Sequence, residues 1–182
     1  MRHAFTLIEI MVVIAIIAAL AVMAAPSLMG SHRKAELTDQ TQRLHDATRY
    51  VQRMAVVKQR TLRLVLTPRD PEHGGRSSYH VELMSTDLDA PQAYVKANGG
   101  SVKPTVLPEG LRLVDVKLDH GEPLDGTLAV RFFADGSADG AVIQLGDDRR
   151  VRSVVIESAT GRVESVPRRV EALPSLREDL DA

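Results

Sequence analysis

The sequence Phe5-Thr6-Leu7-Ile8-Glu9, followed by sixteen apolar residues from Ile10 to Ala25, decides the fold of this chain. A helix from Phe5 to Met29 has a length of roughly 37 Å at about 1.5 Å per residue. The hydrocarbon core of a bilayer is about 30 Å thick, so residues 5–29 are predicted as a transmembrane helix. A carboxylate in lipid costs on the order of 2.5–3.5 kcal/mol at a helix centre and less near the interface. We therefore expect Glu9 to have a partner.

The short leader, the Phe-Thr-Leu-Ile-Glu sequence and the apolar run together resemble the class III signal of type IV pilins and pseudopilins. In that family a prepilin peptidase cuts just before the phenylalanine and methylates the new amino terminus. The resemblance implies a leader peptide of residues 1–4, cleavage between Ala4 and Phe5, and N-methylation of Phe5. The family usually has glycine before the cut, so Ala4 is expected to allow cleavage with lower efficiency. Pro26 lies where family members commonly carry a helix-kinking proline, and a kink is expected there.

Two other interpretations of the N-terminus remain open. One is an ordinary secretory signal peptide that is cut after Ala19-Leu20-Ala21. Glu9 argues against it, because a carboxylate at the start of such an apolar region is unusual. The other is an unprocessed membrane anchor, which differs from the pilin interpretation in processing alone. The mass of the mature chain distinguishes the three.

The helix is predicted to continue well beyond the apolar segment. No Gly or Pro occurs between Ser31 and Gln59, and six apolar or threonine positions recur at spacings of four and three: Leu37, Thr41, Leu44, Thr48, Val51 and Ala55. This pattern predicts one helix from about Phe5 to about Lys58. Its amphipathic part, residues 30–60, is expected to pack on a β-sheet.

From residue 61 the apolar period changes to two, which predicts an antiparallel β domain over residues 61–166. Strands are expected at 62–67, 79–84, 111–118, 127–133, 141–145, 149–157 and 162–166. Residues 85–108 contain three prolines and Asn98-Gly99-Gly100 and are expected to form an exposed connection. The charged tail, residues 167–182, is expected to be loosely ordered. The predicted fold class is α+β, a long N-terminal helix packed on antiparallel sheets, as in the pilin-like fold that the resemblance implies.

A second resemblance concerns the end of the chain. The sequence Phe133-Ala134-Asp135-Gly136-Ser137, the strand Val142–Leu145 and the turn Ala159-Thr160-Gly161-Arg162-Val163 are similar to the end of the H-type minor pseudopilin domain, the GspH/FimT group. The resemblance implies a structural subunit of the periplasmic pseudopilus of a type II secretion system, which helps to push exoproteins through the outer membrane. The chain would be a single-pass inner-membrane protein with its C-terminal domain in the periplasm.

The same resemblance implies the partners. These are other major and minor pseudopilins, the prepilin peptidase and the inner-membrane assembly platform. Glu9 would form the counter-charge to the freed Phe5 amine of an adjacent subunit and so help assembly. A pair of this kind is attractive in a low dielectric. Replacing Glu9 is therefore expected to reduce incorporation into a filament while processing stays intact.

The remaining residues indicate no catalytic chemistry. The chain has a formal net charge of −1 and no cysteine, which excludes disulfides and thiolate metal sites. No catalytic or nucleotide motif occurs, so no enzymatic activity and no cofactor are expected. The six histidines lack metal-ligand spacing. His73 and His80 could meet across a hairpin, although solvated loop histidines are the favoured interpretation. Turn formation is likewise favoured over calcium binding for a group of aspartates: Asp135, Asp139, Asp147 and Asp148.

An alternative function is suggested by arginines in the last two predicted strands and at the start of the tail: Arg149, Arg150, Arg152, Arg162, Arg168 and Arg169. Such a group could hold phosphates, as in a FimT-like type IV pilus minor pilin with a role in pilus assembly or DNA uptake. Interspersed acidic residues argue against nucleic-acid binding, and no metal is expected. A salt-dependent shift assay separates the two functions.

Overall fold

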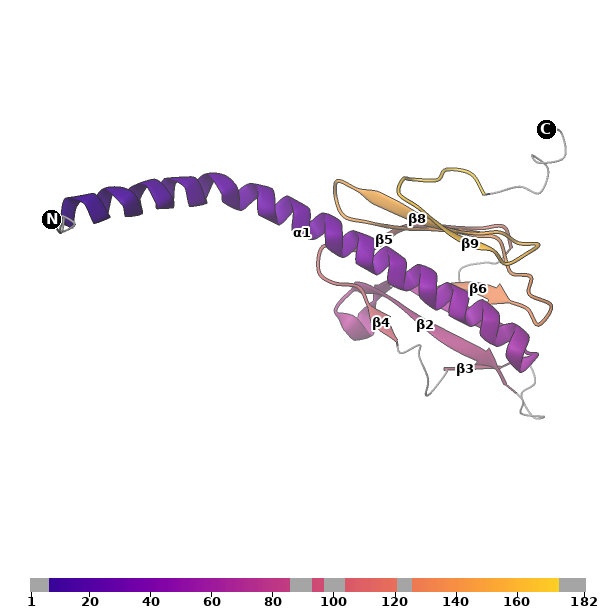
Figure 1. Ribbon diagram of the computed structural model, residues 1–182. Coiled ribbons are helices and arrows are strands. Elements are labelled where there is room, and N and C mark those ends of the chain that lie inside the picture. Colours follow the sequence, from indigo (N-terminus) through magenta and orange to yellow (C-terminus); the bar gives the residue numbers. More distant parts are fainter. Residues whose placement is uncertain (1–6, 86–92, 97–103, 121–125, 174–182) are drawn as a thin grey trace, which may run out of the picture. The chain divides into compact units, whose positions relative to one another are not determined.

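The computed structural model describes residues 7–85, 93–96, 104–120 and 126–173. The chain divides into two compact units, residues 1–36 and residues 37–182. Helix α1 (Leu7–Lys58) begins in the first unit and continues into the second (Figure 1). The prediction of one long helix is confirmed from residue 7 to residue 58. Its first two predicted residues, 5 and 6, lie outside the described part of the chain.

Helix α1 ends where the sequence changes from helical to strand periodicity. Gln59 adopts a left-handed backbone with φ 50°, and the amide of Arg60 donates to the carbonyl of Ala55 at 3.1 Å. A left-handed residue after the last turn closes many helices in this way. Lys58 in the last turn also complements the negative end of the helix dipole.

The second half of α1 packs on the sheets with the predicted stripe. All six stripe side chains are at most 2% exposed: Leu37, Thr41, Leu44, Thr48, Val51 and Ala55. The two threonine hydroxyls donate to the carbonyls four residues earlier, each at 2.7 Å. A buried hydroxyl without a partner costs about 1–3 kcal/mol, so these bonds are what allows threonine in the stripe.

Sheet A has the strand order β3-β2-β1-β6, with β4 pairing to β2. All its pairs are antiparallel, as predicted. Alternate residues of β1 face opposite sides of the sheet, so that Leu62, Leu64 and Leu66 join the core. The strands have these bounds: β1 Leu62–Asp70, β2 Arg76–Met84, β3 Tyr94–Lys96, β4 Thr105–Val106 and β6 Leu128–Phe132.

Sheet B is also antiparallel and has the order β5-β7-β8-β9. Strand β7 is buried on both faces. Ile143 and Leu145 belong to the core that includes α1, whereas Val142 and Gln144 are at most 1% exposed without being part of it. The outer face of sheet B, which carries Val142 and Gln144, is therefore also shielded from solvent. Its strands have these bounds: β5 Arg112–Leu118, β7 Ala141–Gly146, β8 Val151–Ile156 and β9 Val163–Val166.

One hydrophobic core joins α1 with both sheets in the second unit. Phe132 of β6 is its largest fully buried side chain, and the others are mostly Leu, Ile and Val. Truncating a buried phenylalanine costs about 3–5 kcal/mol, so Phe132 is a principal source of stability in a chain with three phenylalanines.

Residues 85–108 depart from the predicted exposed connection. Two short strands, β3 and β4, extend sheet A here, and Leu107 is fully buried. Both strands are three residues long or less, too short for a period-two pattern to show in the sequence. Residues 86–92 and 97–103 lie outside the described part of the chain.

The predicted loop between the first two strands is also shorter than expected. Strands β1 and β2 extend into it, and the 3-10 helix η1 (Pro71–His73) makes the turn between them. The start of the tail differs from the prediction as well, because Arg168 and Val170 are hydrogen-bonded to sheet B. Residues 174–182 lie outside the described chain.

Candidate functional site

The predicted processing site lies at the very start of the chain. Ala4 and Phe5 fall outside the described residues, so cleavage between them and methylation of Phe5 stay predictions. Glu9 lies in the first turn of α1 and is exposed. The positive end of the helix dipole stabilises a carboxylate at this position. This stabilisation comes from the helix itself and needs no second subunit.

Exposed apolar side chains surround Glu9 along this part of α1. Each is at least 46% exposed: Leu7, Ile8, Ile10, Met11, Val12, Val13, Ile14, Ile16, Ile17 and Leu20. A contiguous apolar surface of this kind marks contact with protein or lipid. Among the residues that could be searched in the described chain, no helix is long and apolar enough to span a bilayer.

Pro26 lies inside α1, whose assignment runs through this position without a break. A proline in a helix interior removes one backbone hydrogen bond and commonly bends the axis. The predicted kink at Pro26 stays a prediction.

The two C-terminal motifs meet at one side chain of α1. The amide nitrogen Nε2 of Gln52 donates to the carbonyl of Thr160 at 3.0 Å and to that of Gly136 at 3.4 Å. Gly161 has φ +62°, and a Cβ added there would lie 2.4 Å from the Gly136 carbonyl oxygen. The close approach of these turns therefore requires glycine at position 161. The sequence motifs are thus contact points of the fold.

Asp135 and Asp147 form turn hydrogen bonds, as the sequence predicted, whereas Asp148 forms an ion pair with Arg112 of β5 at 2.9 Å. Oδ1 of Asp135 accepts from the backbone and hydroxyl of Ser137, and Oδ1 of Asp147 accepts from the backbone of Arg149 and Arg150. These hydrogen bonds hold the pKa of Asp135 below its ordinary value. Such side-chain-to-backbone bonds are typical of Asp in turns.

Asp139 has a further role, because it is 4% exposed and paired with Arg131. Its carboxylate accepts from the Arg131 guanidinium at 2.7 and 3.0 Å and from the Arg131 backbone at 2.9 Å. Hydrogen bonding to Asp139 raises the pKa of Arg131. A buried carboxylate needs such compensation, so this pair fixes the turn after β6.

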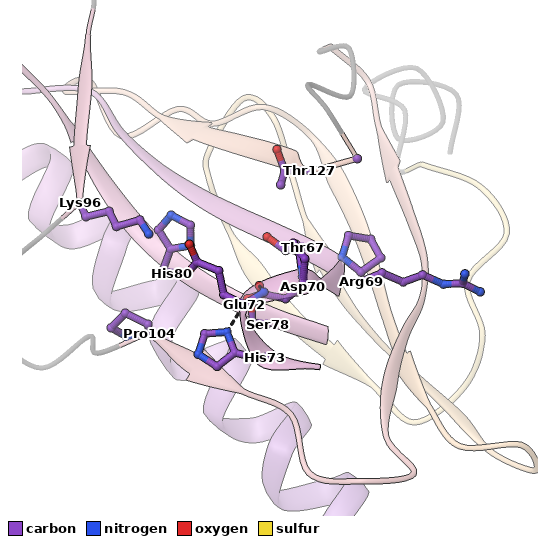
Figure 2. Close-up of a pocket in the computed structure, with 13 residues that line it drawn as sticks. Thr67, Arg69, Asp70, Glu72, His73, Ser78, His80, Lys96, Pro104 and Thr127 are labelled. Carbon is purple, nitrogen blue, oxygen red and sulfur yellow. Dashed lines mark hydrogen bonds and ion pairs between the residues drawn. The ribbon is translucent and has the colours of Figure 1, made fainter. Parts of the chain in front are cut away.

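A cavity of about 650 Å³ opens on the outer face of sheet A. Figure 2 shows side chains from β1, β2, β3 and η1 around it. His73 and His80 both line it, so the structure brings together the two histidines that the sequence left as solvated loop residues. The side chain of His80 is 16% exposed, and its Nε2 lies 3.0 Å from Oε1 of Glu82.

Asp70 organises one end of this cavity. Its Oδ1 accepts from the backbone of Glu72 at 2.9 Å, and its Oδ2 contacts Nδ1 of His73 at 2.8 Å and accepts from the Ser78 hydroxyl. The Ser78 hydrogen bond is the largest of the effects that lower the pKa of Asp70. The carboxylate is an N-cap for η1.

Three side chains at this turn could hold a metal ion, because ligand atoms of Asp70, Glu72 and His73 lie within 4.8 Å of one another. The hydrogen bonds to Asp70 account for its position without an ion. The sequence contained a signal for this turn that the helix and strand patterns did not capture, namely an Asp followed by Pro and then by Gly74-Gly75.

The arginines proposed for phosphate contact do not act as one group. The guanidinium of Arg152 donates to the hydroxyl of Thr38 on α1 at 3.2 Å, and Arg162 forms an ion pair with Glu164 at 2.6 Å. The other four are exposed: Arg149, Arg150, Arg168 and Arg169. Arg152 and Arg162 therefore make contacts within the fold.

Comparison with known proteins gives a family match at the N-terminus and matches to solved structures. The prokaryotic N-terminal methylation motif matches residues 1–25. No curated protein matches the chain. Two structures of the minor pseudopilin EpsH from the type II secretion system of Vibrio cholerae are similar in fold, each with 13% sequence identity.

One of these structures matches with a TM-score of 0.54 and covers 76% of this chain and 99% of its own. The other matches with a TM-score of 0.51 and covers 72% of this chain and 97% of its own. Nearly the whole EpsH chain therefore has a counterpart here, although few residues are identical. The chain combines a prokaryotic N-terminal methylation motif with the α+β, pilin-like fold of the minor pseudopilin EpsH.

Proposed function

We propose that this protein is a minor pseudopilin of a type II secretion system, a structural subunit of the pseudopilus that helps to push exoproteins through the outer membrane. One observation supports the proposal most directly. The chain has both the methylation motif at residues 1–25 and a fold that matches 99% of an EpsH chain. Either feature alone fits several filament proteins. Their combination fits a pseudopilin of the H type.

In this function the N-terminal segment is both a membrane anchor and an assembly element. The apolar sequence extends to Ala25, and helix 5–29 would hold the subunit in the inner membrane with residues 37–182 in the periplasm. Prepilin peptidase would remove residues 1–4 and methylate Phe5. Other pseudopilins and the inner-membrane assembly platform would then take up the mature chain.

Glu9 would guide this uptake. It is a carboxylate in the first turn of a helix whose neighbouring side chains are apolar and exposed. Packing an incoming subunit so that the Glu9 carboxylate stays unpaired among apolar helices costs free energy, because a charge that is buried without a partner loses its hydration. Pairing with the Phe5 amine of the adjacent subunit relieves that cost and sets the axial register.

Mass spectrometry of the membrane-extracted protein tests the processing step. We expect a mature chain that begins at Phe5 and carries one methyl group on its amine. Ala4→Gly should be processed at least as completely, whereas Ala4→Leu should retain residues 1–4. A mature chain beginning at Val22 would assign a secretory signal peptide instead. A wild-type chain that retains Met1 in cells with an active prepilin peptidase would assign an unprocessed anchor.

Assembly is tested with Glu9→Gln and Glu9→Val in cells that form pseudopili. Both variants should be processed normally and should co-purify with the sheared pseudopilus at least about tenfold less than wild type, which corresponds to about 1.4 kcal/mol. Glu36→Gln on the same helix is the matched control and should assemble normally. Normal incorporation of both Glu9 variants would exclude the pairing.

The alternative function, a type IV pilus minor pilin with a role in pilus assembly or DNA uptake, is favoured by the four exposed arginines. Arg149 and Arg150 follow β7, and Arg168 and Arg169 follow β9. A shift assay with residues 31–182 and duplex DNA at several salt concentrations decides this. Binding at physiological salt that falls steeply with added salt, and that is lost on changing these arginines to alanine, would favour the uptake function.

A further inference from the structure

The turn between β1 and β2 brings three side chains that can bind a metal ion to one end of the cavity on sheet A. Asp70, Glu72 and His73 all line this cavity (Figure 2), and their ligand atoms lie within 4.8 Å of one another. Donor atoms that bind one ion at about 2.0–2.1 Å are separated by about 3.0–3.4 Å. Oδ2 of Asp70 and Nδ1 of His73 are 2.8 Å apart, and the exposed Glu72 side chain can complete the set by rotation alone.

The fold holds the Asp70 carboxylate in place before any ion binds. Its Oδ1 accepts from the amide of Glu72, and its Oδ2 accepts from the hydroxyl of Ser78. A carboxylate oxygen has two lone pairs, so Oδ2 can bind an ion and keep the Ser78 bond while the ion replaces the direct contact with His73. Hydrogen bonds of this kind orient the carboxylate ligands of metal sites.

Thr67 supplies an independent sign that this end of the cavity accommodates a ligand. It pairs with Ser78 across β1 and β2, so the two side chains lie on the same face of the sheet. Thr67 is 9% exposed and lines the cavity, yet its hydroxyl forms no hydrogen bond within the part of the chain that the structure describes. A nearly buried hydroxyl without a partner is unfavourable, and a water molecule held on an ion would supply that partner.

The donor set and the space around it indicate which ion fits. One imidazole nitrogen with two carboxylates is a ligand combination that Zn²⁺ uses, with water at the remaining position. Ca²⁺ takes roughly six to eight oxygen ligands, more than this turn offers. The cavity of about 650 Å³ has ample room for ion-bound water, since one water molecule fills about 30 Å³.

We propose that Asp70, Glu72 and His73 bind one divalent transition-metal ion, with Zn²⁺ as the best fit, and that the Thr67 hydroxyl hydrogen-bonds to a water on this ion. The expectation of no metal rested on the spacing of the histidines from one another. Here a single histidine joins acids one and three residues before it, on a 3-10 turn. The bound ion stabilises the turn between β1 and β2. The proposal is independent of the proposed secretion function.

Isothermal titration calorimetry of the full-length, untagged protein in detergent with Zn²⁺ tests the site. One ion should bind per chain with a Kd below about 10 μM, and a tenfold excess of Ca²⁺ should not displace it. His73→Ala and Glu72→Gln should each weaken binding at least about tenfold, with circular dichroism verifying that the fold is kept. His120→Ala is the matched control and should bind as wild type does, because His120 is exposed and contacts the neighbouring Asp119 carboxylate through Nδ1.

Thermal unfolding provides a second measurement. Saturating Zn²⁺ should raise the Tm of the wild-type protein, because a ligand that binds the folded state stabilises it. Addition of a chelator should reverse this shift, and His73→Ala should not show it. Thr67→Val should weaken Zn²⁺ binding at least about threefold, and an unchanged affinity would overturn the role of its hydroxyl. Absence of Zn²⁺ binding, or wild-type affinity in both His73→Ala and Glu72→Gln, would overturn the site. Tighter binding of Ca²⁺ than of Zn²⁺ would overturn the choice of ion.

Discussion

At the scale of single residues, Asp70 holds the turn between β1 and β2 through three side-chain contacts. Its carboxylate accepts from the Glu72 amide and the Ser78 hydroxyl and contacts His73. Asp70→Ala should lower the free energy of unfolding by about 1–3 kcal/mol, because it removes an N-cap and leaves the buried Ser78 hydroxyl without its acceptor. Glu72→Ala, which keeps the backbone donor and removes an exposed carboxylate, should change it by less than about 0.5 kcal/mol. Urea denaturation of both variants measures the difference, and equal effects would contradict it.

Glu82 should give the domain a measurable dependence on acid. Burial raises its pKa, but hydrogen bonds from His80 and Arg63 more than offset this and hold the pKa below its ordinary value. A carboxylate with a lowered folded-state pKa stabilises the fold fully above its unfolded pKa and loses that contribution as the pH falls through the folded value. Unfolding measured between about pH 7 and pH 3 should therefore show a loss of stability that Glu82→Gln reduces. An unchanged pH profile in Glu82→Gln would show that this carboxylate contributes nothing.

At the scale of elements, the turns that carry the C-terminal motifs depend on glycine for space. Gly161 has φ +62° and no room for a Cβ, whereas Gly126 has φ +78° and nothing within 4 Å. Gly161→Ala should therefore cost at least about 2 kcal/mol, and Gly126→Ala about 1–2 kcal/mol from backbone strain alone. Thermal or urea unfolding of the two variants separates the steric effect from the strain. Equal losses would mean that the turns move apart without penalty.

The elements also explain why sequence reasoning succeeded where it did. The stripe Leu37–Ala55 and the strands of sheet B have long, regular periods, and packing follows such periods directly. Strands β3 and β4 are too short to carry a pattern and exist because β2 offers them a paired edge. The cavity with His73 and His80 escaped detection for a similar reason. A 3-10 turn and a cross-strand register bring those side chains together, and neither is visible as a local period.

Residues 167–173, at the start of the tail, show the same limit. Their composition, with charges and proline, is typical of a loose tail. Their order comes from Gln144 and Ser153, which lie on strands β7 and β8, more than ten residues away in sequence. Long-range hydrogen bonds to a main chain leave no signature in the segment that receives them.

At the scale of the whole molecule, the division into two units predicts which fragments fold. Among the residues whose burial the structure describes, every member of the hydrophobic core lies at or after Leu37. A fragment of residues 31–182 should therefore unfold cooperatively, because it keeps the complete core. A fragment of residues 59–182 should not, because it lacks four core side chains of α1 that are at most 2% exposed and would leave the sheets uncovered: Leu37, Leu44, Val51 and Ala55. Losing even one such leucine costs about 2–5 kcal/mol, comparable with the 5–15 kcal/mol that stabilises a whole domain. Circular dichroism and urea denaturation of both fragments measure this. Cooperative unfolding of residues 59–182 would show that the sheets are stable alone, and that the helix is an attachment to the domain instead of a part of its core.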